Sequence, residues 1–256
     1  MMTWLMRMIL ALGLLLTPGA RPDASITVMG ATSLLSYARA VVSGWARQHP
    51  EIRVAISGGG SYAGWYGLAA GHADIALSDL DLGRGPAVNE RRLGQMPILF
   101  VANPENGVES VTRRDLVRIF SGRVHHWQAL GGNPRPIRLV ARPSGSGARA
   151  VVSQSLGETP RHLAQIIQLS NGAVVRAVEE TPGAIGYVEG DRRWPGVVTL
   201  RIGGQAYRPG SRGWPFYAFP RIYWRQAASP AVFSLVSALA HSSLARSFGI
   251  FPRTGS

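Results

Sequence analysis

The sequence predicts an α/β protein of two lobes, each a mixed or parallel sheet flanked by helices, with a ligand cleft between the lobes. Short apolar runs repeatedly end in small-residue turns that open onto segments with helical spacing, a pattern typical of α/β units. Turn-rich segments at 103–107 and 214–219 then mark two crossings between lobes. We therefore assign residues 25–103 and 214–256 to the first lobe and residues 104–213 to the second.

The first 24 residues have the pattern of a secretory signal peptide. Arg7 precedes a short apolar run at 9–16, and small or helix-breaking residues follow it at 17–20. Such a run is shorter than a membrane span requires, and a buried core helix is the alternative interpretation. We expect cleavage within 19–24 and a periplasmic protein without a lipid anchor, because the chain has no cysteine.

The first lobe is expected to gather polar side chains at the ends of its strands. The turns after three successive strands carry Thr32 and Ser33, then Ser61, then Ser78 and Asp79. In a parallel sheet these strand ends would meet at one crevice. The predicted order is strand 25–29, helix 32–48, strand 52–56, helix 62–70, strand 73–79, strand 96–102 and, after the second lobe, a helix over 230–247 that packs back on the first.

The second lobe contains a Gly/Ser loop that suits an anion. An apolar run at 139–141 leads into Arg142, the small-residue turn 143–148 and a helix over 150–156. Free backbone N–H groups at such a helix start, bracketed by Arg142 and Arg149, favour phosphate or sulfate, although an ordinary turn is the alternative. The other elements expected here are helix 112–120, helix 160–169 and strand 184–188.

Composition excludes several classes of chemistry. The formal net charge is +13, and all 27 basic residues are arginine, so a phosphate-loop lysine and a Schiff-base lysine are excluded. The arginines occur singly or in pairs, so we expect no nucleic acid partner. The adjacent His125 and His126 lack the spacing of a zinc helix, so no metal or other cofactor is expected. No nucleophile has an identifiable base, so we expect a protein that is not an enzyme.

Several motifs in order give the chain a family resemblance. They are Gly30-Ala31-Thr32, Gly60-Ser61, Ala73-Asp74, Ser78-Asp79, Ile119-Phe120-Ser121-Gly122-Arg123 with Trp127 and Leu130-Gly131-Gly132, Arg142 with Gly145-Ser146-Gly147, Pro182-Gly183-Ala184-Ile185-Gly186-Tyr187-Val188 and Trp214-Pro215-Phe216. Together they make the chain resemble the periplasmic phosphate-binding proteins of the phosphate ABC importer. This branch of the two-lobed solute-binding proteins implies a type II-like binding-protein fold, inorganic phosphate as ligand, an ABC permease as partner, and a monomer.

The resemblance also implies a ligand set drawn from four loops. It comprises Thr32 and the N–H of Ser33, then Ser61, then Asp79, and finally Arg142, Ser146, Gly147 and Ala148. Ala148 departs from the usual threonine, which removes one hydroxyl donor at a cost of about 1 kcal/mol. The expected mode is metal-free, with helix N-termini and hydroxyls donating, one arginine balancing charge and one carboxylate accepting.

A carboxylate in the set would select for a protonated anion. Phosphate carries a proton that Asp79 can accept, whereas sulfate carries none and would face like charge in a dry cleft. Each residue also has a structural alternative: Asp79 as a helix N-cap, Thr32 as a cap, and Arg142 paired on the surface with Glu158 or Asp81. Alternative functions are binding of sulfate or molybdate, a phosphate sensor, and an enzyme acting on phosphate esters.

Overall fold

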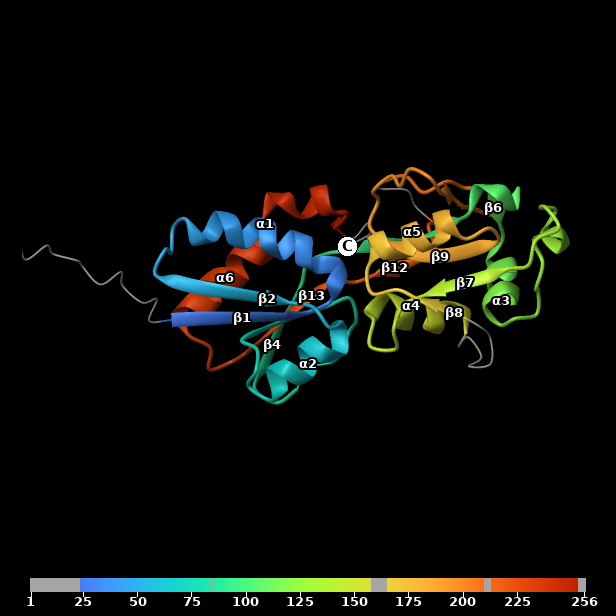
Figure 1. Ribbon diagram of the computed structural model, residues 1–256. Coiled ribbons are helices and arrows are strands. Elements are labelled where there is room, and N and C mark those ends of the chain that lie inside the picture. The colour runs from blue at the N-terminus through green and yellow to red at the C-terminus, as the bar shows by residue number, and fades with distance from the viewer. Residues whose placement is uncertain (1–23, 84, 158–164, 210–212, 253–256) are drawn as a thin grey trace, which may run out of the picture.

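The computed structural model describes residues 24–83, 85–157, 165–209 and 213–252, which form two α/β lobes lying end to end (Figure 1). The predicted signal segment therefore lies outside the described residues, except for residue 24. Within the described ranges, every helix is too short or too polar to span a membrane.

The first lobe is a five-stranded sheet in the order β2-β1-β3-β13-β4. β1 runs parallel to β2 and β3, whereas β13 runs antiparallel to β3 and β4. Helices α1 and α6 cover one face and α2 the other (Figure 1). The elements are β1 (Ala24–Gly30), η1 (Thr32–Leu34), α1 (Leu35–Ala46), β2 (Ile52–Ser57), α2 (Ser61–Ala69), β3 (Ile75–Ser78), β4 (Val88–Arg92), β13 (Arg221–Arg225), α6 (Pro230–His241) and η4 (Ser243–Phe248).

The second lobe is a six-stranded sheet in which β10-β5-β9-β7-β8 are neighbours and β12 also pairs with β5. β7 runs parallel to β8 and β9, and β5 runs antiparallel to β9. Figure 1 shows α5 on one face and α3 and α4 on the other. The elements are β5 (Met96–Ala102), η2 (Pro104–Asn106), β6 (Ser110–Val111), α3 (Arg113–Phe120), η3 (Trp127–Leu130), β7 (Arg138–Ala141), α4 (Gly147–Leu156), β8 (Gln165–Ile167), α5 (Asn171–Glu180), β9 (Ala184–Glu189), β10 (Val198–Thr199), β11 (Arg201–Ile202) and β12 (Tyr217–Ala218).

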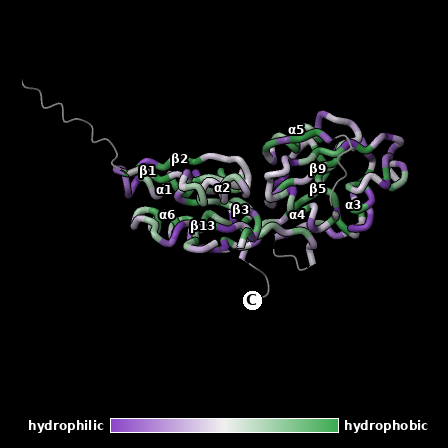
Figure 2. The backbone as a smooth tube through the Cα atoms, turned by 90° about the horizontal axis from the view of Figure 1, so that it is seen from below, coloured by the Kyte–Doolittle hydropathy of each residue, from purple (hydrophilic) through white to green (hydrophobic). Residues whose placement is uncertain are grey.

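Each lobe has its own apolar core. In the first lobe, Tyr37, Val41 and Trp45 are buried along one face of α1, which follows from their spacing of four residues on a helix. In the second, all residues of β5 and β9 are buried, as expected for central strands covered on both faces. The tube in Figure 2 shows hydrophobic segments inside each of the two lobes, with β5 and β9 together in the second.

The crossings between the lobes differ from the predicted boundaries at 103 and 214. β5 belongs to the second sheet, because it pairs with β9 over Ile98–Ala102, and the first crossing lies at its start, where Met96 still packs in the first core. Trp214 and Ala218 are buried in the second core, and β13 pairs within the first sheet, so the return lies between β12 and β13. Both boundaries were wrong because a run of buried apolar residues does not reveal which distant strand it pairs with.

The predicted helix over 160–169 is also wrong where the structure describes it. Residues 165–167 form β8, which pairs in parallel with Leu139–Ala141 of β7. Residues 160–164 lie outside the described ranges. The free energy gained by pairing with β7 outweighs the helix propensity of this segment, because local propensity is weak compared with tertiary contacts.

Candidate functional site

Strand ends from both lobes meet at a cavity in the interlobe cleft. β1 and β2 supply residues from the first lobe, and β7 and β8 lead into those of the second. This arrangement follows the rule that ligands bind at the carboxyl ends of parallel strands. The cavity has a volume of about 240 Å³ and is lined by Thr32, Gly59, Gly60, Arg142, Pro143, Ser146 and Leu169.

The guanidinium of Arg142 is buried and bridges the two lobes. Its Nη2 donates to Thr32 Oγ1 at 2.6 Å and to the carbonyl of Leu169 at 3.1 Å, and its Nη1 donates to Asn171 Oδ1 at 3.1 Å. Only 3% of the side chain is exposed, and Nε has no hydrogen-bond partner in the part of the chain that the structure describes. A buried cation with an unused N–H is suited to an anion in the cleft.

The surface alternatives for Arg142 receive no support. Asp81 forms its ion pair with Arg221 instead. Glu158 lies outside the described residues. Thr32 does not cap η1 by a side-chain hydrogen bond, but accepts from Arg142.

Asp79 follows β3 and faces the second lobe as a buried acceptor. Ser33 Oγ donates to Asp79 Oδ1 at 2.8 Å, and the backbone N–H of Asp79 donates to Ser61 Oγ at 3.0 Å. Asp79 is 3% exposed, and it caps none of the described helices. The two serines therefore orient a carboxyl group whose remaining lone pairs can accept a proton from a ligand.

The N-terminus of α4 reaches into the cleft beside Asp79. Ser146 is the N-cap residue, whose Oγ accepts from the N–H of Arg149 at 3.5 Å, and the N–H groups of Gly147 and Ala148 precede the first intrahelical bonds. Gly147 is closely packed: a Cβ there would lie 2.5 Å from Ser61 Oγ. Ala148 is fully buried in the second core, so that its contribution to the cleft is an N–H group.

Sequence reasoning missed Glu189, which ends β9. Its side chain is 1% exposed, its Oε2 lies 3.7 Å from Arg142 Nη1, and its carboxyl group lies near that of Asp79. Burial raises the pKa of both carboxyl groups, and the negative charge of Asp79 raises the pKa of Glu189 further. Ligand sites lie at the carboxyl ends of parallel strands, and this rule also selects Glu189 once β9 is known to lie parallel to β7.

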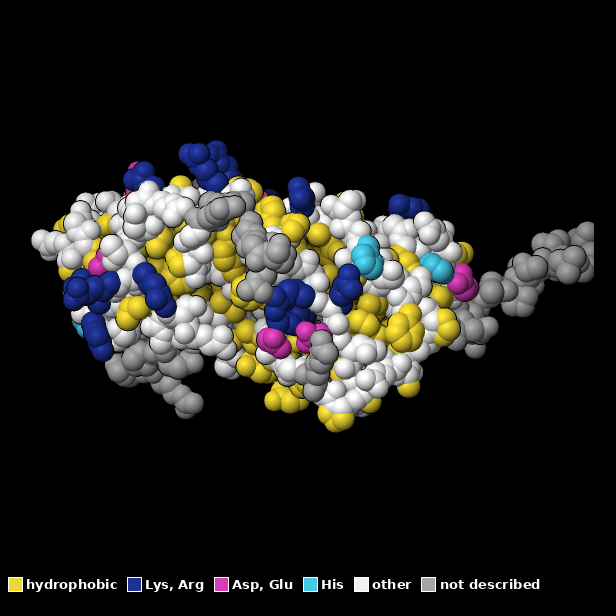
Figure 3. Space-filling model, turned by 180° about the vertical axis from the view of Figure 1, so that it is seen from behind, with side chains coloured by type: hydrophobic (Ala, Val, Ile, Leu, Met, Phe, Trp, Pro, Cys, Tyr) yellow, Lys and Arg dark blue, Asp and Glu magenta, His cyan; other side chains and the backbone are white. Residues whose placement is uncertain are grey.

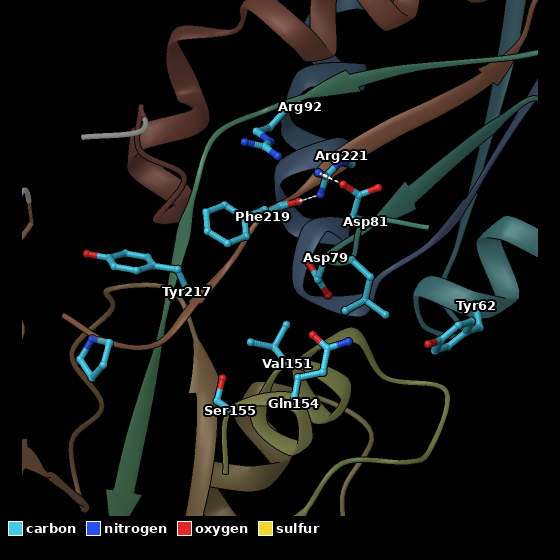
Figure 4. Close-up of a pocket in the computed structure, with 12 residues that line it drawn as sticks. Tyr62, Asp79, Asp81, Arg92, Val151, Gln154, Ser155, Tyr217, Phe219 and Arg221 are labelled. Carbon is cyan, nitrogen blue, oxygen red and sulfur yellow. Dashed lines mark hydrogen bonds and ion pairs between the residues drawn. The ribbon is translucent and has the colours of Figure 1, made fainter. Parts of the chain in front are cut away.

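A second cavity lies on the other side of Asp79, against the strand that returns to the first lobe. It has a volume of about 520 Å³. Figure 4 shows Val151 and Gln154 of α4 across the cavity from Asp81 and Arg221. The ion pair between Asp81 and Arg221 occupies the polar end, and Asp79 and Arg92 also line this cavity.

The predicted residues thus lie at facing edges of the two lobes. Hydrogen-bond donors and a buried acceptor within one cleft suit a small oxyanion that carries a proton. Among the described residues, no group of three metal-ligating side chains comes together. On the face shown in Figure 3 the basic side chains are dispersed and do not form one continuous stripe.

Comparison with known proteins identifies the family of the chain. The family model described as the PBP superfamily domain matches residues 17–197. The phosphate-binding protein PstS of Bacillus subtilis is 26% identical over 218 residues, which cover 82% of this chain and 73% of that protein.

Two solved structures show the same fold. The first is a putative phosphate ABC transporter substrate-binding protein from Clostridium perfringens with bound phosphate. Its TM-score is 0.80 at 21% identity, and the match covers 89% of this chain and 99% of the other. An ABC-type phosphate transport receptor from Vibrio cholerae gives 0.74 at 24% identity, covering 89% and 100%.

Proposed function

The chain belongs to the PBP superfamily, and from that premise we propose that it captures inorganic phosphate between its lobes and delivers it to an ABC importer. One observation carries the proposal: Arg142 from the second lobe and Asp79 from the first lie buried at the same cleft. A cation and a carboxylate side by side select an anion that can also donate a proton. The similar proteins are named as phosphate-binding or phosphate-transport proteins, which supports phosphate as the anion.

The proposed ligand contacts assign a role to each residue. Arg142 balances charge, Thr32, Ser61 and Ser146 donate hydroxyl hydrogen bonds, and Asp79 accepts the proton of the anion. The backbone N–H groups of Ser33, Gly147 and Ala148 complete the set.

Titration of the purified protein with phosphate and sulfate by calorimetry tests the proposal. We expect phosphate to bind at micromolar concentrations or below and sulfate to bind poorly. Asp79→Asn should weaken phosphate binding about 5-fold to 150-fold, from roughly 1–3 kcal/mol of unmatched hydrogen bonding, and should let sulfate compete. Asp81→Asn is the matched control, because Asp81 pairs with Arg221 outside the site. Absence of phosphate binding to the unaltered protein would refute the proposal.

Export and delivery are parts of the same proposal with tests of their own. Mass spectrometry of the exported protein should find a new N-terminus within residues 19–24. The phosphate-loaded protein should stimulate ATP hydrolysis by its reconstituted permease, and an exported sensor would instead leave that hydrolysis unchanged.

A further inference from the structure

We propose that Glu189 is a positioning residue of the phosphate site, whose carboxyl group holds a proton and donates it to Asp79 across the cleft. Closing the lobes on the anion is thereby coupled to that proton. The inference rests on the proposed phosphate function.

The contact between the two carboxyl groups joins the lobes directly. Asp79 follows β3 of the first lobe, and Glu189 ends β9 of the second. Both side chains are buried, and their carboxyl groups lie close enough for each to shift the pKa of the other. Carboxylate oxygens are acceptors only, so a hydrogen bond between two such groups requires a proton on one of them.

The surrounding charges also favour a single negative charge on the pair. Arg142 is the nearest cation, with Nη1 at 3.7 Å from Glu189 Oε2, and one guanidinium cannot neutralise two buried carboxylates. Arg149 lies one step further away and donates to the carbonyl of Arg142. The hydroxyl of Tyr187, which accepts from the N–H of Arg142, has its pKa raised to about 12 by burial and stays neutral.

The proton resides on Glu189 rather than on Asp79. Asp79 already accepts a hydrogen bond from the hydroxyl of Ser33, which stabilises its ionised form, whereas Glu189 Oε1 has no partner among the described residues. Asn171 fixes the backbone of Glu189 by donating from Nδ2 to its carbonyl oxygen at 3.0 Å. The carboxyl group of Glu189 is therefore held toward Asp79 and Arg142.

Loss of this proton should disfavour the closed form. Because the folded-state pKa of Glu189 is raised above its ordinary value, the folded state retains a proton that the unfolded chain releases. Stability is therefore fully present below the ordinary pKa of about 4.3 and is lost as pH rises through the raised value. Above it, two carboxylates would face each other across the cleft.

The test compares the full chain with Glu189→Gln, which keeps a donor and an acceptor but cannot ionise. Urea denaturation without ligand, from about pH 5 to about pH 8, should show the folded-to-unfolded ratio of the unaltered protein falling relative to Glu189→Gln by up to tenfold per pH unit. Glu180→Gln is the matched control, because Glu180 is exposed at the end of α5. A difference between the unaltered protein and Glu189→Gln that does not change with pH would overturn the inference.

Phosphate affinity gives the second readout. The phosphate affinity of Glu189→Gln should depend less on pH than that of the unaltered protein, because the amide keeps a donor but cannot ionise. At higher pH the affinity of the unaltered protein should fall faster than that of the variant, since phosphate's own titration affects both equally. Binding that falls in parallel for both proteins would count against Glu189. Failure of both to bind phosphate at any pH would refute the proposed function instead, with the denaturation result still deciding the state of Glu189.

Discussion

Replacing Gly147 by alanine should separate lobe closure from folding. Gly147 is the first residue of α4, and its backbone lies outside the left-handed region that favours glycine. An added Cβ would lie 2.5 Å from Ser61 Oγ, 2.7 Å from Asp79 Cβ and 2.9 Å from Asp79 Oδ2. All three atoms belong to the opposite lobe, so the methyl group obstructs the approach of the lobes and leaves the helix itself undisturbed.

The magnitude follows from these distances. Ordinary contacts of a Cβ begin at 3.4 Å, so the lobes would have to separate by about 1 Å at this point. Overpacking of this kind costs roughly 1–3 kcal/mol, which corresponds to a phosphate Kd about 5-fold to 150-fold higher. Within the helix, alanine is preferred over glycine by up to about 1 kcal/mol, so the second lobe should not unfold more readily.

Calorimetric titration with phosphate, together with thermal unfolding without ligand, measures the two effects separately. Gly172→Ala provides the matched control, because Gly172 lies in the first turn of α5 and an added Cβ would meet nothing within 4 Å. We expect Gly172→Ala to bind phosphate as the unaltered protein does. An unchanged Kd in Gly147→Ala would show that the site does not require the close approach of the lobes seen here.

Two further predictions concern the framework around the site. Thr112→Ala removes the capping box in which the hydroxyl of Thr112 and the carboxylate of Asp115 cap α3, and should lower the free energy of unfolding by about 1 kcal/mol with no change in phosphate affinity. Urea denaturation and calorimetry check both, and a weakened affinity would contradict this reasoning, because no residue of α3 lines either cavity. Tyr187→Phe leaves the buried N–H of Arg142 without its acceptor at 3.1 Å, and should cost about 1–3 kcal/mol of stability and weaken phosphate binding as well. Equal stability of the variant and the unaltered protein in urea would refute that reasoning.

Sequence patterns identified the strand ends of the first lobe because each signal was local. The small-residue turns before Thr32 and Ser61, and the polar pair ending in Asp79, each follow an apolar strand directly. Parallel pairing of β1 with β2 and β3 then brings them to one edge. To place these residues together, we needed only to assume that neighbouring strands run parallel. The alternation of strands and helices in the sequence supports that assumption.

The parts that escaped prediction depend on pairings between distant segments. β5 was assigned to the wrong lobe, because its partner β9 lies far away in the sequence. Residues of β8 were predicted as part of a helix, because their pairing with β7 has no local signal. Glu189 was missed for the same reason, although it stands directly after the predicted strand 184–188. Residues whose role comes from a tertiary neighbour carry no local signal of that role.

The attraction of this protein for an anion has two separate sources. Within the cleft, the charge of Arg142 is shared between the anion and the nearby carboxyl group of Glu189, so directed hydrogen bonds decide which anion fits. Outside the cleft, the formal net charge of +13 acts over the whole surface and falls off within a Debye length of about 8 Å at physiological salt. Salt should therefore act mainly on the rate of encounter, while discrimination between anions remains a property of the buried acceptor, where ions in solution do not screen it.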